Sequence, residues 1–273
     1  MTALLQVESL SKNFGGLTAV SDVSLSVDRG EIASIIGPNG AGKTTLFNLL
    51  SGVFRPSSGM MRFDGIDSCK IAPARFAAAG IGRTFQNLAL FKHGTVVENI
   101  LVGRHSHMRS NVLEAAIFFG RTRQEEIKAR QRVEEIIEFL EMEHFRDAIV
   151  GTLSYGQQKR VELARALASE PKLLLLDEMV SGMNQEETED IARFILDIRE
   201  ELEVTILMIE HDMRIVMDIS DRVHVLNFGK KIAEGTPAEM QDNLAVREAY
   251  LGDGKGKTSG DPGSLKQPIY IHA

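Results

Sequence analysis

A glycine-rich stretch at residues 37–45 constrains the fold of this chain more than any other feature. It reads Gly37-Pro-Asn-Gly-Ala-Gly-Lys-Thr-Thr45 and fits the phosphate-binding pattern G-x-x-x-x-G-K-S/T. The apolar run 32–36 before it predicts a buried strand, and the run 46–50 after it predicts a helix. The pattern requires this setting, because its glycines let backbone N–H groups surround a phosphate chain at a helix N-terminus. The sequence therefore predicts an α/β fold with a phosphate site.

Two side chains of this loop have predicted contacts to a nucleotide. Lys43 can reach the β- and γ-phosphates, and the Thr44 hydroxyl can hold Mg²⁺. The expected nucleotide-binding residues of the loop are Gly37, Pro38, Asn39, Gly40, Ala41, Gly42, Lys43, Thr44 and Thr45.

The composition limits the classes of function. The 273 residues carry a formal net charge of −7, which does not indicate nucleic-acid binding through bulk electrostatics. The one cysteine, Cys69, excludes an internal disulfide and fits a reducing compartment. Residues 1–8 are too short and too polar for a signal peptide, and no apolar run approaches the roughly 18–20 residues that cross a bilayer. Any role at a membrane is therefore expected to be peripheral.

Hydrophobic patterning indicates two lobes of different character in the first half of the chain. Alternating apolar and polar residues predict half-buried strands at 4–10, 23–27 and 60–63. With the strand before the phosphate loop, they predict a small β-rich lobe around the first half of the nucleotide site. Residues 95–145 carry apolar residues at helical spacing among many charges, which predicts a helical insertion.

From residue 156 onward, the predicted elements alternate between helix and strand. Such alternation indicates a parallel sheet that is covered on both faces. Residues from 252 onward are rich in Gly, Lys, Ser and Pro and predict a loose tail. The expected helices are at about 156–169 and 186–201, and the expected buried strands are at 172–176 and 204–209.

Two acidic residues follow the predicted strand at 172–176. Ligands bind beyond the carboxyl ends of parallel strands, so Asp177 is expected beside the phosphate loop, where a carboxylate can hold Mg²⁺ through its waters. Glu178 can face the γ-phosphate and polarise an attacking water. Phosphoryl transfer requires mainly positioning and charge compensation, so one such carboxylate is enough. We predict Glu178 as a catalytic residue and Asp177 as a metal ligand.

A stretch at residues 153–160 resembles the signature sequence of the ATP-binding-cassette (ABC) ATPases, whose commonest form is Leu-Ser-Gly-Gly-Gln. Ser154 is a good N-cap for the following helix, and Gly156 lets a ligand approach the helix N-terminus closely. Tyr155 departs from the family pattern, but Ser154 and Gly156 are its phosphate-facing members. The resemblance implies that Ser154, Tyr155, Gly156 and Gln157 contact the ATP of a partner subunit.

Three further positions match the family in the order of its motifs. His211 resembles the switch histidine, which implies a catalytic role. Gln86 resembles the glutamine of the Q-loop, which can ligate Mg²⁺ and sense the γ-phosphate. Phe14 stands where the family stacks an aromatic ring on adenine. These matches imply that Gln86 and Phe14 contact ATP.

The family's dimer-contact loop corresponds to residues 181–184, and two positions here depart from its pattern. Met179 stands where proline is usual, and Asn184 stands where a closing aspartate is usual. The departures concern this loop and not the expected catalytic residues.

The resemblance covers residues 4–251 and implies ATP hydrolysis coupled to transmembrane transport. The implied fold is a P-loop NTPase cassette with a RecA-like parallel sheet core, an antiparallel β lobe and a helical subdomain. The signature, the helical insert and the ending at 234–252 resemble ATP-binding subunits of importers for branched-chain amino acids or related small solutes. The implied parts are 1–94 (first part of the core with the β lobe), 95–155 (helical subdomain ending in the signature), 156–251 (second part of the core) and 252–273 (flexible tail).

The chain has one signature and one phosphate loop, at opposite ends of its surface. The resemblance therefore implies a pair of ABC ATPase subunits, identical or closely related, with two composite sites between them. It also implies two integral membrane permease subunits and a periplasmic solute-binding protein as partners, and no nucleic acid. The implied location is peripheral, on the cytoplasmic face of the inner plasma membrane.

Two alternative functions stay open. ATPases of lipopolysaccharide or lipid export systems look very similar to this chain. A soluble ABC protein that acts on ribosomes or DNA is disfavoured, because the ribosomal type joins two cassettes and the DNA type carries a long coiled coil. Neither feature is present, and the net charge is negative. Co-purification with an integral membrane protein, as against ribosomes or DNA, separates these classes.

Overall fold

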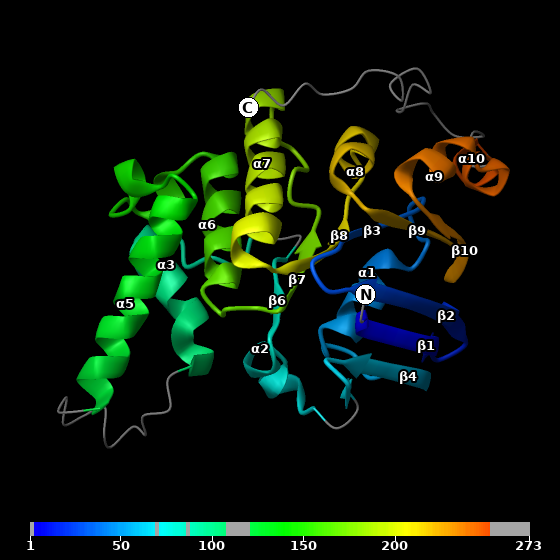
Figure 1. Cartoon of the computed structure of the whole chain (residues 1–273), viewed down its shortest axis with the longest axis horizontal. Coiled ribbons are helices and arrows are strands. Elements are labelled where there is room, and N and C mark those ends of the chain that lie inside the picture. Colours follow the sequence, from blue (N-terminus) through cyan, green and yellow to red (C-terminus); the bar gives the residue numbers. More distant parts are fainter. Residues whose placement is uncertain (1–2, 69–70, 86–87, 108–120, 252–273) are drawn as a thin grey trace. The chain divides into compact units, whose positions relative to one another are not determined.

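The computed structural model describes residues 3–68, 71–85, 88–107 and 121–251 (Figure 1). The chain divides into two compact units, of which the first combines residues 1–73 with 175–273 and the second comprises residues 74–174. Within the described ranges, every helix is too short or too polar to cross a lipid bilayer.

The first unit contains a four-stranded antiparallel sheet in the order β2-β1-β4-β5. The turn between β4 and β5 places Asp64 and Gly65 at φ values of 50° and 75°, as a two-residue hairpin turn requires. The predicted β-rich lobe is therefore confirmed, and its first two strands are longer than their alternation indicates. The strands are β1 (Ala3–Phe14), β2 (Leu17–Asp28), β4 (Ser58–Phe63) and β5 (Ile66–Asp67).

The larger sheet runs in the order β10-β9-β3-β8-β7 through the first unit. β3 pairs in parallel with both β8 and β9, whereas β10 pairs antiparallel with β9. Every residue of β3, β7 and β8 is buried, which explains why their sequences are continuous apolar runs. The expected parallel core is confirmed, with one antiparallel edge strand that the pattern did not predict. The strands are β3 (Ile32–Ile36), β7 (Leu173–Asp177), β8 (Thr205–Ile209), β9 (Arg222–Asn227) and β10 (Lys230–Gly235).

Three helices of the first unit, α7, α8 and α9, begin at residues whose side chains cap them. Asn184, Asp212 and Thr236 each accept a backbone N–H from the first turn of the helix that follows. α7 buries Ile191, Ile195 and Ile198, which recur at the helical period. The helices are α1 (Lys43–Leu50), α7 (Gln185–Leu202), α8 (Met213–Ile219), α9 (Pro237–Asp242) and α10 (Leu244–Leu251).

The second unit is mainly helical, and α3, α5 and α6 lie side by side in it (Figure 1). The helical insertion is confirmed for its described residues, while the predicted apolar positions between 112 and 117 lie outside them. β7 begins in this unit, where the Leu173 N–H donates to the Gly80 carbonyl at 3.0 Å. The elements are α2 (Phe76–Ala79), β6 (Ile81–Arg83), α3 (Val96–Gly103), α5 (Arg121–Phe139) and α6 (Tyr155–Leu167).

Candidate functional site

The phosphate loop joins the buried end of β3 to the first turn of α1. Gly37 has a φ of 153°, and Gly42 caps α1 in the left-handed region with a φ of 97°. A Cβ atom would lie 2.1 Å from the Leu226 carbonyl oxygen at position 37 and 2.5 Å from the Ala19 carbonyl oxygen at position 42. Only glycine fits at these two positions, because neighbouring strands press against the outer side of the loop. The predicted strand–loop–helix arrangement is thus confirmed.

The middle of the loop is a turn that is tied to the adjacent hairpin. The Ala41 N–H donates to the Pro38 carbonyl at 3.1 Å, and the Gly229 N–H donates to the Ala41 carbonyl at 2.9 Å. Asn39 and Gly40, at the tip of this turn, are exposed. The loop is therefore hydrogen-bonded to the hairpin on one side, while its tip is exposed.

Lys43 lies folded into the loop and is only 6% exposed. Its Nζ donates to the Gly37 carbonyl at 2.6 Å and to the Pro38 carbonyl at 3.1 Å. Burial lowers the pKa of this ammonium, whereas the nearby carboxylates of Glu178 and Asp177 raise it. A phosphate oxygen is a stronger acceptor for this cation than a neutral carbonyl, so the loop is ready to exchange one for the other.

Asp177 and Glu178 stand where β7 ends. Asp177 is 1% exposed. Glu178 adopts a φ of 52°, in the left-handed region that non-glycine residues rarely occupy, and its N–H donates to the Ile209 carbonyl at 2.9 Å. Because Ile209 is the last residue of β8, this bond fastens the ends of two strands together. Strained backbone of this kind is concentrated at functional sites.

His211 follows β8 and reaches the same place. Its Nε2 lies 2.9 Å from Oε1 of Glu178, although the two residues are 33 positions apart. Asp212 caps α8 by accepting the Arg214 N–H at 2.9 Å, so the histidine is presented from the turn before that helix. The ends of β3, β7 and β8 thus bring Lys43, Asp177, Glu178 and His211 to one edge of the sheet.

Glu210 is a residue of this edge that sequence reasoning missed. It is 3% exposed, its Oε1 accepts the Val180 N–H at 3.2 Å, and the backbones of Met179 and His211 also donate to it. Burial raises the pKa of its carboxyl group to about 7. Glu210 therefore ties the backbone after Glu178 to the backbone of the histidine. Its position in the sequence, between a buried strand and His211, could have identified it as a residue of the site.

The structure also places four further residues that the sequence analysis singled out. Thr44 is exposed and Thr45 is half-buried in the first turn of α1. Phe14 ends β1 and is 43% exposed. Asn184 caps α7, because its amide oxygen accepts the Glu187 N–H at 2.9 Å.

The predicted signature lies in the second unit, at the N-terminus of α6. The Ser154 hydroxyl accepts the Gln157 N–H at 3.2 Å, and Oε1 of Gln157 accepts the Ser154 N–H at 3.0 Å. The expected N-cap is therefore confirmed as a reciprocal capping box. Gly156 is buried, whereas Tyr155 is 44% exposed with the Lys159 ammonium 5.9 Å from its ring centroid. The helix thus presents Ser154 and Tyr155 at the surface of this unit.

Gln86 lies outside the described residues, but the segments beside it are bound to α6 within the second unit. The Phe85 N–H donates to Oε1 of Glu162 at 3.0 Å, and Arg165 donates to the Ala89 carbonyl. Glu162 is fully buried, its pKa is raised by burial, and Arg165 lies 3.7 Å from it. Sequence reasoning missed this pair, although charges three residues apart on a buried helix face were a visible signal.

The geometry fits a nucleoside triphosphate with Mg²⁺. Gly37 and Gly42 shape a loop with no room for side chains on its packed side, and Lys43 supplies a positive charge within it. Thr44 and Asp177 offer a hydroxyl and a carboxylate, which are the hard oxygen donors that Mg²⁺ prefers.

Comparison with known proteins agrees with this site. Residues 20–181 match the family described as "ABC transporter", and residues 230–256 match "Branched-chain amino acid ATP-binding cassette transporter". The chain is 43% identical to the high-affinity branched-chain amino acid transport ATP-binding protein BraF of Pseudomonas aeruginosa, covering 92% of this chain and 98% of BraF. It is 36% identical to the lipopolysaccharide export system ATP-binding protein LptB of Haemophilus influenzae, covering 92% and 98%.

A solved structure shows the same fold. The ADP conformation of MJ1267, an ATP-binding cassette of an ABC transporter, superposes with a TM-score of 0.81 at 34% identity, covering 93% of this chain and all of that one. The P-loop cassette fold expected from the sequence is therefore confirmed. Together with the two family matches, this places the chain among the ATP-hydrolysing subunits of ABC transporters, in their branched-chain amino acid type.

Proposed function

We propose that this chain powers an importer for branched-chain amino acids or a related small solute, and that Glu178 polarises the water that attacks ATP. The relatives' names and the match at residues 230–256 support the solute class. The hydrogen bond of 2.9 Å between Glu178 and His211 is the observation that carries the catalytic assignment.

This bond gives the two residues complementary tasks. Glu178 is 14% exposed as a side chain, so its carboxylate can accept a proton from a water at the edge of the sheet. His211 orients that carboxylate and can balance charge as the proton moves. The left-handed backbone at Glu178 and its bond to Ile209 keep the carboxylate in place before ATP arrives.

The remaining site residues are assigned to binding. Residues 37–45 surround the phosphates, with Lys43 exchanging loop carbonyls for phosphate oxygens. Thr44, Asp177 and Gln86 would hold Mg²⁺, which would supply charge neutralisation at the phosphates. Phe14 stacks on the adenine, and Gln86 also contacts ATP.

We infer that Ser154, Tyr155, Gly156 and Gln157 act on the ATP of a second ABC subunit, identical or related. The exposed, capped N-terminus of α6 supports this role, because it presents positive potential to an anion. Two permease subunits and a periplasmic solute-binding protein complete the proposed importer. The ATPase pair then lies on the cytoplasmic face of the inner membrane, bound to the permeases.

The test is the substitution Glu178→Gln, which keeps the shape of the side chain and removes the base. We expect ATP hydrolysis to fall by at least about 100-fold, while the variant binds ATP and accumulates as a dimer. Glu201→Gln, which changes an exposed carboxylate of α7, is the matched control. Hydrolysis by Glu178→Gln at the parent rate would exclude this residue as the base.

Export of lipopolysaccharide is the competing function, and the 36% identity to LptB is the observation in its favour. Purification from native membranes separates the two. An importer subunit should co-purify with permease subunits. The reconstituted complex should then take up leucine, isoleucine or valine. Co-purification with lipopolysaccharide export components would overturn the importer proposal.

A further inference from the structure

The ring of Phe14 is not isolated on the surface of the first unit. It lies against Phe54, with ring centroids 5.3 Å apart and planes at 75°, which is the edge-to-face arrangement that aromatic pairs prefer. The Lys12 ammonium lies 5.1 Å from the centroid of Phe14 and 5.7 Å from that of Phe54. We name Lys12, Phe14 and Phe54 the aromatic platform.

The backbone fixes each member of the platform. Lys12 and Phe14 are two residues apart on β1, so both side chains project from the same face of the strand. Lys12 Nζ donates to the Arg55 carbonyl at 2.8 Å, which holds the cation beside both rings. The Phe54 N–H donates to the Asn48 carbonyl of α1 at 2.9 Å, so this ring is anchored to the helix that starts at the phosphate loop.

The platform lies within a short distance of the phosphate loop. Phe14 pairs with Leu17 across the β1–β2 turn, and the Ala19 carbonyl lies against Gly42 of the loop. Ala19 is two positions beyond Leu17 along β2, which corresponds to at most roughly 7 Å of strand. A ligand whose phosphates occupy the loop can therefore extend its other end toward Phe14.

Burial does not account for this cluster. Phe14 is 43% exposed, its strand partner Leu17 is 68% exposed, and Val53, which precedes Phe54 in the chain, is 56% exposed. A cluster that only stabilised the fold would place its rings in the core. Lys12 and Phe54 instead cover part of the Phe14 ring and leave the rest open, as a surface for stacking requires.

We propose that Lys12 and Phe54 are positioning residues that hold the Phe14 ring in its stacking orientation before a nucleotide base arrives. This inference rests on the proposed role of Phe14 at the adenine. An already ordered ring loses little freedom on binding, so the two residues strengthen affinity for the base. They do not touch the phosphates, so the rate of the chemical step does not depend on them.

The experiment compares ADP with pyrophosphate by calorimetry, because the two share a diphosphate and differ by the nucleoside. We expect Phe54→Leu and Lys12→Gln each to weaken ADP binding about fivefold and to leave pyrophosphate binding unchanged. The KM for ATP should rise by a similar factor while kcat stays within about twofold. Phe54→Tyr and Lys12→Arg should restore parent values, since they keep the ring edge and the cation. Val53→Ala, beside Phe54, is the control.

The outcomes separate this inference from the proposed function. Parent ADP affinity in Phe54→Leu and Lys12→Gln, with a loss in Phe14→Ala, would overturn the positioning role and leave the adenine role of Phe14 intact. Parent affinity in Phe14→Ala would overturn both. An equal loss for ADP and pyrophosphate would show that the variants disturb the fold and not the base site. ATP hydrolysis by the parent protein tests the proposed function independently.

Discussion

The two edges of the larger sheet in the first unit both gather charged residues, but they hold them differently. At the carboxyl edge, where β3, β7 and β8 end, Lys43 donates to neutral carbonyls and its pKa is lowered by burial. Glu210 is buried at the same edge with a pKa raised to about 7. These charged forms are thus less stable than they would be in water.

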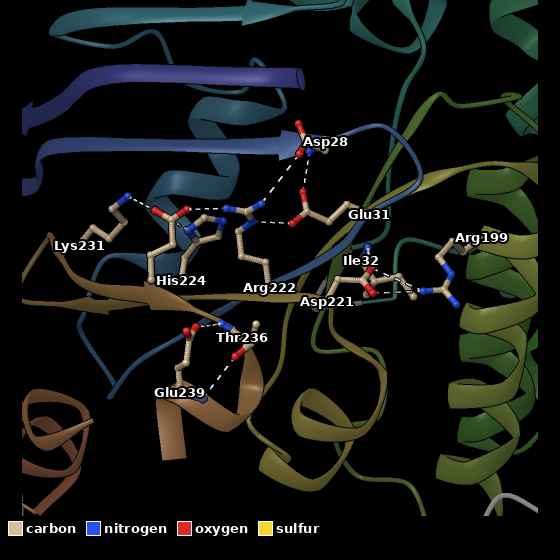
Figure 2. A network of polar contacts seen from close by, with 11 residues as sticks. Asp28, Glu31, Ile32, Arg199, Asp221, Arg222, His224, Lys231, Thr236 and Glu239 are labelled. Atoms are coloured by element: carbon tan, nitrogen blue, oxygen red, sulfur yellow. Dashed lines mark hydrogen bonds and ion pairs between the residues drawn. The ribbon is translucent and has the colours of Figure 1, made fainter. Parts of the chain in front are cut away.

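At the amino edge, where β3 and β9 begin, the charges are compensated. Arg222 has three carboxylates around it, and its guanidinium lies 2.6 Å from Glu31, 3.1 Å from Glu234 and 3.9 Å from Asp28. Figure 2 shows it beside Glu31 and Asp28. His224 lies 3.6 Å from Glu234, and together with Lys231 it holds the pKa of that carboxyl far below its usual range. The hydrogen bond to Glu31 in turn raises the pKa of Arg222.

The difference shows that the two edges of one sheet serve different purposes, because one stabilises the fold and the other prepares a binding site. The amino edge places each charge beside an opposite one, so its ionised form favours the folded state. The carboxyl edge buries Lys43 and Glu210 at a cost to their charged forms, which lowers stability and prepares the site for phosphates. Substitutions at the carboxyl edge should therefore change ligand affinity, whereas substitutions at the amino edge should change the free energy of unfolding.

The largest expected effect is on ligand binding at the carboxyl edge. Lys43→Ala removes the one cation described within the phosphate loop, and we expect the Kd for ATP to rise about 100-fold. Arg222→Met removes a cation from the amino edge, where β9 begins, and should leave the Kd within about twofold of the parent value. Calorimetric titration of both variants measures this. Equal effects would abolish the distinction between the edges.

The pH dependence of stability should reveal Glu210. Its folded pKa of about 7 lies above the ordinary value, so its contribution to stability is complete below pH 4.5 and is lost as the pH rises through 7. We expect this carboxyl to remove about 2 kcal/mol from the free energy of unfolding between pH 5 and pH 8.5. Urea titrations of Glu210→Gln should lack this loss, whereas Glu201→Gln should retain it. A parent-like slope in Glu210→Gln would contradict the assignment.

Breaking the amino edge should lower stability without changing nucleotide binding. Arg222→Met leaves Glu31, which is 8% exposed, without its nearest cation, and we expect the free energy of unfolding to fall by about 1.5 kcal/mol. Arg199→Met is the control, because its contacts with Glu200 at 2.8 Å and with Asp221 at 3.5 Å involve exposed carboxylates, so the loss should stay under about 0.5 kcal/mol. Chemical denaturation measures the stabilities. A change in ATP affinity in Arg222→Met would link the two edges.

The smallest expected effect comes from Glu234, whose contribution to stability changes with pH in the opposite direction from that of Glu210. The pKa of Glu234 is lowered by His224 and Lys231, so its contribution is present above pH 4.5 and is lost as the pH falls toward the folded pKa. Since the carboxylate is partly exposed, we expect less than about 1 kcal/mol between pH 5 and pH 3. Glu234→Gln should lose less stability than the parent over this acid range. An unchanged acid slope would show that solvent screens the network.

Much of the fold was predictable because its signals are local. The apolar runs at β3, β7 and β8 predicted buried strands, since a strand buried on both faces needs no polar residue. Ser154 predicted the start of α6, because a cap bonds to residues only three positions away. The glycines of the loop at 37–45 and the apolar runs on both sides of it predicted a strand–loop–helix arrangement.

The sequence by itself determined the cassette fold, the phosphate loop and the family to which the chain belongs. Only the tertiary structure decided which distant side chains meet. Glu178 contacts His211 across 33 positions, and Arg222 contacts Glu31 across 191. The ring contact between Phe54 and Phe14 could not be predicted from the sequence pattern either. Strand order brings such residues together, and strand order depends on how the whole sheet packs, which no local period or cap encodes.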